Sequence, residues 1–351
     1  MKILGCETAV VQVNFEGVMP GTHIVLRLIT DDGREGISYV SRVNPRNMRP
    51  LRLLVEAMVQ LVIGRDATDL PEICKRLYAA APGAPVTGLE LRAASAVEIA
   101  AWDLKGKALQ QPVHQLLGAT RTRVPVSANW GLMPGQDPGV LAAHIDRLLA
   151  RGFGALKCPV GMAPLDKAIA HVQFVRRCAG PGVRIIVDGN FSWSVEQALL
   201  FAHATEDCDL YWIEDPVAPH DYAGLKHVTD AIQQNTCAGE MFQQRHEFRE
   251  LLARRGADHI MIDQDLGLAG FMQVAGMAER AGCPVINHLA PEILLHAVAA
   301  APNGLIVGLV PWAQPLFLEQ LQVVAGELVL PEIPGLGLTL DAEMLERCAI
   351  E

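Results

Sequence analysis

Between residues 124 and 309 the sequence alternates short apolar segments, typical of buried strands, with longer segments of helical periodicity. Strands that alternate with helices form a parallel sheet, because each helix returns the chain to the start of the next strand. Eight such units favour a closed (β/α)8 barrel of the TIM type, an α/β fold; an open doubly wound sheet is the structural alternative. The expected strands are Val124–Ala128, Ala155–Lys157, Arg184–Asp188, Leu210–Glu214, Thr236–Glu240, His259–Ile262, Pro284–His288 and Leu305–Leu309.

Helices are expected in the intervals between these strands. Gly152, Gly180 and Gly282 stand where the residue after a helix is commonly glycine, which supports helix ends at these points. The clearest helical segments are Leu141–Ala150, Asp166–Cys178, Val195–Thr205, Phe271–Ala281 and Pro291–Ala300.

The sequence before about residue 115 has a different pattern. Asp31, Asp32 and Gly33 form a turn signal between two β-rich segments, which predicts a hairpin. Residues 50–110 are helical in character, and apolar residues in Leu89–Leu109 recur every three to four positions. The expected strands of this region are Met1–Phe15, Thr22–Thr30 and Glu35–Val40. We therefore expect an α+β region ahead of the barrel.

Length and composition limit the class of protein. The 351 residues suit one large domain with a smaller one, and 50% apolar residues can fill a sizeable core. A formal net charge of −10 without basic runs argues against nucleic acid as a partner, because phosphate contacts need clustered Lys and Arg. The scattered cysteines, with no Cys-x-x-Cys pair, are typical of reduced residues. No segment has the pattern of a bilayer span or a signal peptide, so we expect no membrane association and a cytoplasmic location.

Three acidic residues end three consecutive expected strands: Asp188, Glu214 and Glu240. They are spaced by 26 residues in each step (214 − 188 and 240 − 214), which is one βα unit. All three should therefore lie at the barrel face where active sites form. Three carboxylates there would repel one another without a cation, and their all-oxygen set favours Mg²⁺, with Mn²⁺ also compatible. The alternative is that they are separate exposed loop residues.

Further polar residues follow neighbouring strands. Lys157 ends the second expected strand and could neutralise charge or act as a base beside the metal; alone, it would be read as a solvated surface lysine. His288 ends the seventh strand, and Asp265 follows the sixth. An Asp that orients a His fixes its tautomer and raises its pKa, which suits a general base, so we predict an Asp265–His288 pair. The alternative for His288 is a structural histidine.

Ordered motifs extend along nearly the whole chain: TDDGREG, AAWDLKGKALQQPVHQLLG, DGN, IEDP, AGE, DLGLAG, NHLAPE and PWAQPLF followed by PEIPGLGLTLD. Together they resemble the enolase superfamily, specifically its mandelate racemase-like subgroup. The resemblance implies an α+β capping domain over residues 1–118, a barrel over 119–315, and a segment over 316–351 that returns to the capping domain.

The resemblance also implies a chemistry. Mg²⁺ held by Asp188, Glu214 and Glu240 would bind a substrate carboxylate, and His288 would remove the α-proton to give an enediolate that Mg²⁺ and Lys157 stabilise. The substrate would be a small-molecule hydroxy or sugar acid. Asn190, two positions after the first metal ligand, could bind the substrate or shape the loop. Members of this group are commonly homo-oligomers.

Two departures from the family pattern limit the possible reactions. Pro159 stands where many members carry a second lysine that serves as a base, and Gly308 stands where many carry a Glu that donates to the substrate carboxylate. One base that can act first as base and then as acid suits an acid-sugar dehydratase, which eliminates water. A racemase or epimerase of a 2-hydroxy acid needs a proton donor on the opposite face, which Lys157 would have to supply. A metal-binding barrel without catalysis is the third alternative.

Overall fold

A computed structural model describes residues 1–15, 21–41, 44–79 and 85–350. Within these residues, eight parallel strands are hydrogen-bonded in chain order, and the last strand also pairs with the first. The closed (β/α)8 barrel is therefore confirmed, and the open-sheet alternative is wrong. The barrel strands are β4 (Arg123–Ala128), β5 (Ala155–Pro159), β6 (Arg184–Asp188), β7 (Leu210–Glu214), β8 (Thr236–Ala238), β9 (His259–Asp263), β10 (Val285–His288) and β11 (Gly304–Leu309).

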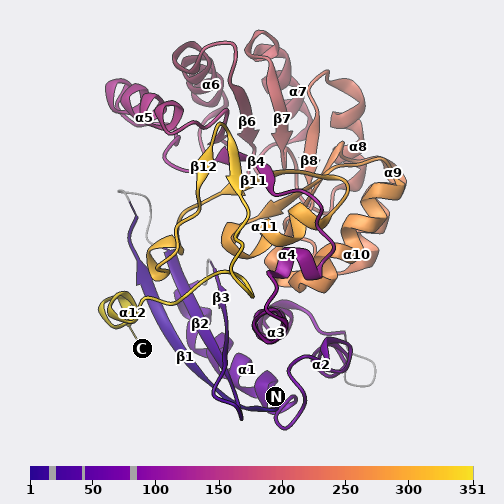
Figure 1. Ribbon diagram of the computed structural model, residues 1–351. Helices are drawn as coiled ribbons and strands as arrows, with labels where there is room; N and C mark the ends of the chain where they lie inside the picture. Colours follow the sequence, from indigo (N-terminus) through magenta and orange to yellow (C-terminus); the bar gives the residue numbers. More distant parts are fainter. Residues whose placement is uncertain (16–20, 42–43, 80–84, 351) are drawn as a thin grey trace.

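Helices surround the barrel on its outer side (Figure 1). Successive side chains of a strand point to opposite faces, so each strand contributes to two cores. Leu156, Ile185 and Ile213 face the helices, whereas the residues between them face the barrel axis. The outer helices and 3₁₀ turns are α5 (Pro138–Ala150), α6 (Leu165–Ala179), α7 (Val195–Ala204), η2 (Glu206–Cys208), α8 (Tyr222–Ala231), α9 (Arg245–Arg254), η3 (Gln264–Leu266), α10 (Gly267–Arg280), α11 (Pro291–Ala300) and η4 (Gln314–Leu316).

The described residues among the first 109 form an antiparallel sheet with helices packed on one side, which we call the cap (Figure 1). This is the α+β region expected from the sequence. Its elements are β1 (Ile3–Val13), β2 (Gly21–Thr30), β3 (Glu35–Val40), η1 (Pro45–Asn47), α1 (Met48–Gln60), α2 (Leu70–Leu77) and α3 (Gly88–Leu109).

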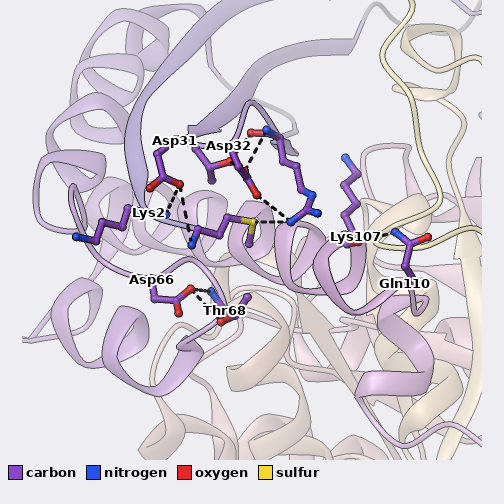
Figure 2. A network of polar contacts seen from close by, with 10 residues as sticks. Lys2, Asp31, Asp32, Asp66, Thr68, Lys107 and Gln110 are labelled. Atoms are coloured by element: carbon purple, nitrogen blue, oxygen red, sulfur yellow. Dashed lines mark hydrogen bonds and ion pairs between the residues drawn. The ribbon is translucent and has the colours of Figure 1, made fainter.

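The turn between β2 and β3 lies where the sequence predicted it (Figure 2). Gly33 has a φ of 80°, a left-handed conformation that glycine adopts without steric cost. The Thr30 hydroxyl donates to Asp32 Oδ1 at 2.7 Å, and Arg34 donates to Asp32 Oδ2 at 2.9 Å. Lys2 N donates to Asp31 Oδ1 at 2.8 Å, which joins the turn to the start of β1. The acidic turn residues therefore fix the hairpin by local hydrogen bonds.

Helix α3 lies between the cap sheet and the barrel (Figure 1). Its sequence predicted one apolar stripe, but its polar residues Glu98 and Asp103 are also fully buried. Glu98 accepts from Ala269 N of α10 at 2.8 Å, and Asp103 accepts from Ile37 N and Leu336 N, each at 2.8 Å. The helix is thus buried on several sides because the cap, the barrel and the C-terminal segment all pack on it.

The chain after the barrel contacts both parts of the fold. Strand β13 pairs antiparallel with the start of β4, and Ile350 N donates to Val10 O of β1 at 2.8 Å. In Figure 1 this segment, in yellow, runs from the barrel towards the sheet of the cap. The remaining elements are α4 (Val113–Leu116), β12 (Val323–Val324), β13 (Glu327–Val329) and α12 (Ala342–Cys348).

The structure bears on two expectations from the sequence: reduced cysteines and no segment that spans a membrane. Each cysteine is a free thiol in the structure. Among the described residues, no helix has both the length and the apolar character that crossing a bilayer requires.

A buried hydrogen bond joins the cap to the barrel at Glu292, the second residue of α11. The Tyr39 hydroxyl, on β3, donates to Glu292 Oε2, and both side chains are almost completely buried. Burial raises the pKa of Glu292 to about 7, with the bond from Tyr39 acting in the opposite direction. Folded protein therefore keeps a proton on this carboxyl at pH values where an unfolded chain has lost it.

Replacing Glu292 by Gln is expected to remove part of the pH dependence of stability. Folding binds a proton at Glu292 between the ordinary Glu pKa and about 7, so the wild-type free energy of unfolding falls as pH rises through this window. The linked loss is about 3.5 kcal/mol, because the pKa rises from 4.5 to about 7 and each pKa unit corresponds to about 1.4 kcal/mol. The stability of Glu292→Gln relative to wild type should therefore increase with pH across the window in urea unfolding. A pH-independent difference would contradict the assignment.

Candidate active site

The site lies at the carboxyl ends of the barrel strands. Side chains two residues apart on a strand share a face, so Ala155, Ile186 and Trp212, which line the barrel interior, predict the direction of the next inward residues. Those residues are Lys157 on β5, Asp188 on β6 and Glu214 on β7. The apolar layer to which Ala155, Ile186 and Trp212 belong fills the barrel interior, so the polar groups lie directly above buried apolar side chains.

Lys157, Asp188 and Glu214 form a buried charge cluster. Lys157 Nζ lies 3.0 Å from Asp188 Oδ2 and donates to Glu214 Oε1. Burial alone would lower the pKa of Lys157, but Asp188, Glu214 and Glu240 together raise it well above its usual value. Lys157 is therefore a cation held by carboxylates, and the reading of a solvated surface lysine is wrong.

The carboxylates of the cluster fit a hard divalent ion. Asp188, Glu214 and Asp215 each offer an oxygen within 4.8 Å of the others, and all three residues are buried. Burial is the largest cause that raises the pKa of Glu214 to about 7; Asp188 and Glu240 raise it further, and Lys157 lowers it. A cation among these groups would relieve their repulsion, and the oxygen donors match Mg²⁺.

Glu240 and Asp215 differ from the sequence-based picture. Strand β8 ends at Ala238, so Glu240 follows the strand by two residues instead of ending it. Its Oε2 lies 3.1 Å from His288 Nε2. Asp215 follows Glu214 directly, and its φ of 41° breaks the alternation of the strand. Asp215 belongs to the motif IEDP, but regular alternation along the strand would point its side chain away from that of Glu214. Glu240 as a metal ligand stays a prediction.

His288 is paired with Asp263, so the predicted Asp265–His288 pair is wrong. His288 Nδ1 donates to Asp263 Oδ2, and the two residues are partners in the parallel register of β9 and β10. The chain turns into η3 after Asp263, which carries Asp265 away from the ring of His288. Asp265 instead accepts from Arg92 Nε at 2.8 Å. The strand expected from the sequence ended at Ile262, whereas β9 extends one residue further to Asp263, which lies level with His288.

The His288 imidazole is held between two carboxylates. Burial alone would lower the pKa of His288, but Glu240 and Asp263 raise it above the ordinary histidine value. With Nδ1 donating to Asp263, Nε2 is the ring nitrogen left to exchange a proton on the side of Glu240. The ring therefore has the fixed orientation that a general base needs. This arrangement favours the general base over the alternative of a structural histidine.

Two other positions were singled out from the sequence. Asn190 N donates to Asp188 Oδ1 at 2.8 Å, so the backbone of Asn190 fixes the orientation of Asp188; substrate binding by its side chain stays a prediction. A Cβ added to Gly308 would lie 2.5 Å from Asn129 Nδ2, so the Asn129 side chain occupies this space. Ser127 Oγ donates to Asn129 Oδ1 at 2.7 Å, which turns the amide nitrogen towards Gly308.

Comparison with known families agrees with this architecture. Residues 4–118 match the family described as the mandelate racemase / muconate lactonizing enzyme N-terminal domain, and residues 140–344 match the enolase C-terminal domain-like family. The chain belongs to the mandelate racemase / muconate lactonizing enzyme family. It is accordingly a Mg²⁺-dependent enzyme of the enolase superfamily.

Relatives that match this chain over most of its length have several named activities. A 3,6-anhydro-α-L-galactonate cycloisomerase of Streptomyces coelicolor is 29% identical over 93% of this chain and 91% of its own length. A racemase of Streptomyces coelicolor, solved with bound magnesium, is 27% identical with a TM-score of 0.91, covering 99% of this chain and 100% of that one. An L-talarate dehydratase of Polaromonas sp., solved with Mg and L-glucarate, is 27% identical with a TM-score of 0.91, covering 100% and 98%.

Proposed function

We propose that this protein is an acid-sugar dehydratase, in which His288 removes the α-proton of a polyhydroxy carboxylate and water is then eliminated. The single observation that carries the proposal is the buried Asp263–His288 pair beside the Lys157 and carboxylate cluster. Pro159 occupies the position of a second base, so one imidazole has to serve both proton transfers. The L-talarate dehydratase solved with a sugar acid has the same fold and supports this substrate class.

The proton transfers balance around one side chain. Neutral His288 accepts the α-proton at Nε2, and the electrons of the broken C–H bond move into the carboxylate as an enediolate. The imidazolium then donates this proton to the departing β-hydroxyl, so that one water leaves and a 2-keto-3-deoxy acid forms after tautomerisation. Asp263 stabilises the imidazolium in the interval. Lys157 supplies positive charge beside the developing negative charge.

The metal would be held by the acidic cluster. Asp188 and Glu214, with Glu240 as the predicted third ligand and Asp215 within reach, offer the oxygen atoms. When bound there, Mg²⁺ supplies the positive charge that makes a proton next to a carboxylate acidic enough to remove. Asn190 contributes by fixing Asp188 through its backbone amide.

A substrate screen tests the proposal. The protein, with Mg²⁺, is incubated with a library of aldonic and aldaric acids, and 2-keto-3-deoxy products are assayed. We expect turnover of at least one polyhydroxy acid by wild type and none by the metal-stripped protein. Absence of such a product with every acid, while α-hydrogen exchange occurs, would contradict dehydration and leave proton abstraction intact.

A racemase or epimerase of a 2-hydroxy acid is the second candidate, favoured by the solved racemase of the same fold. It needs a second proton carrier, and Lys157 is the lysine that the cluster offers. The carboxylates on Lys157 Nζ raise its pKa, which keeps it charged and makes it a poor acceptor. Incubation in D₂O with a chiral 2-hydroxy acid separates the readings, because inversion with deuterium incorporation supports the racemase. Absence of exchange with any acid would favour the non-catalytic barrel.

A further inference from the structure

Arg92 of the cap contacts Asp265, a carboxylate next to the partner of the proposed base. It lies in the first turns of α3, which packs against η3 of the barrel. Arg92 Nε lies 2.8 Å from Asp265 Oδ2, and the side chains are only 24% and 8% exposed. The ion pair is therefore largely shielded from water, where charge interactions are stronger than at a surface.

Asp265 and Asp263 form a pair of neighbouring buried carboxylates. Asp265 N donates to Asp263 Oδ1 at 2.8 Å, so a short backbone turn holds the two residues together. Burial and the charge of Asp263 raise the pKa of Asp265 to about 7, and Arg92 acts against this. Burial would also raise the pKa of Asp263, but His288 and Arg92 together lower it. Two buried anions this close need positive charge on both sides to stay ionised.

We propose that Arg92 is a positioning residue for His288: it neutralises Asp265, so that Asp263 stays ionised and keeps its bond to His288 Nδ1. This inference rests on the proposed function, since it concerns the same base. Its consequence is that the base is complete only when the cap is seated on the barrel, because Arg92 belongs to α3.

The guanidinium of Arg92 balances the charge of the two neighbouring carboxylates. Without the guanidinium, Asp263 and Asp265 would share a buried site with one cationic partner, and the pair would take up a proton. This proton would be shared by the two carboxyls. In the fraction of molecules in which it lies on Asp263, that carboxyl would donate to the imidazole, so the His288 tautomer would no longer be fixed. Loss of groups that orient a reacting residue from behind typically lowers activity by about 10- to 100-fold.

The test compares Arg92→Met with the double variant Arg92→Met, Asp265→Asn. Arg92→Met should lower kcat for α-proton exchange by about 10- to 100-fold, with little change in KM because Arg92 acts behind the base. The double variant should regain most of this loss, because it removes the anion that Arg92 neutralised. A role limited to fastening the cap would predict no recovery, since both variants lack the ion pair.

Two further measurements distinguish the role of Arg92 in positioning His288 from an effect on protein stability, and test it without relying on the proposed reaction. Arg92→Lys keeps the charge and should retain more activity than Arg92→Met; equal loss would overturn the charge argument. In ¹⁵N NMR of histidine side chains, which needs no turnover, Arg92→Met should convert His288 from one tautomer to a mixture. An unchanged spectrum, or a double variant no better than Arg92→Met, would overturn the inference. Inactivity of wild type with a single His288 tautomer would instead count against the proposed function.

Discussion

Replacing His288 by Asn is expected to abolish exchange of the substrate α-proton. A positioned general base contributes about 10²- to 10⁴-fold to a proton transfer, and Asn cannot accept the proton at neutral pH. The side chain is of similar polarity and can still donate to Asp263, so the fold and the metal site should survive. The loss should therefore fall on kcat and not on Mg²⁺ binding.

Exchange is measured by mass spectrometry or NMR of the acid after incubation in D₂O. His227→Asn is the matched control, because His227 is exposed on α8, one of the helices on the outer side of the barrel. Wild-type exchange rates in the control and loss in His288→Asn are the expected pair of results. Residual exchange close to wild type in His288→Asn would mean that another group, with Lys157 first to test, takes the proton.

Replacing Glu214 by Gln is expected to remove both Mg²⁺ binding and activity. Glu214 is completely buried, contacts Lys157 and lies beside Asp188 in the acidic cluster. An exposed carboxylate elsewhere on the surface could not replace it as a metal ligand at this position. Wild type should be stabilised by the metal, since a ligand at about 100 times its Kd adds about 2.7 kcal/mol. The variant should lose this stabilisation, because a neutral amide is a weak ligand for a hard cation.

Thermal melting with and without Mg²⁺, together with calorimetric titration, measures the effect. Glu279→Gln is the control, because Glu279 is an exposed carboxylate near the end of α10. The expected result is a Mg²⁺-dependent rise in Tm for wild type and Glu279→Gln and none for Glu214→Gln. A full Mg²⁺ response in Glu214→Gln would show that the metal is held elsewhere.

The same titration identifies the third ligand. The spacing of the strand ends predicts Glu240, whereas the structure brings an oxygen of Asp215 within 4.8 Å of those of Asp188 and Glu214. We expect Glu240→Gln to weaken Mg²⁺ binding more than Asp215→Asn does. The opposite order would assign the third position to Asp215 and leave Glu240 as a partner of His288.

Local periodicity was sufficient for the architecture. The bounds of β6, β7 and α11 agree with the expected segments to the residue. The side chains of a strand or helix alternate between faces every few positions, so the apolar pattern of the local sequence is sufficient to locate these elements. Closure of the barrel followed from the number of units. The placement of Lys157, Asp188 and Glu214 together followed from the common direction of parallel strand ends.

Only the tertiary structure decided which groups meet behind these strand ends. Asp263, not Asp265, reaches His288 because the chain leaves β9 for η3 at that point, and the register of β9 against β10 sets the pairing. Arg92 comes from the cap, 173 positions before its partner Asp265. The sequence determines where each side chain sits along its own strand or helix. Contacts between elements depend on register, on where a strand stops and on how domains pack, and these are properties of the whole chain that no local pattern contains.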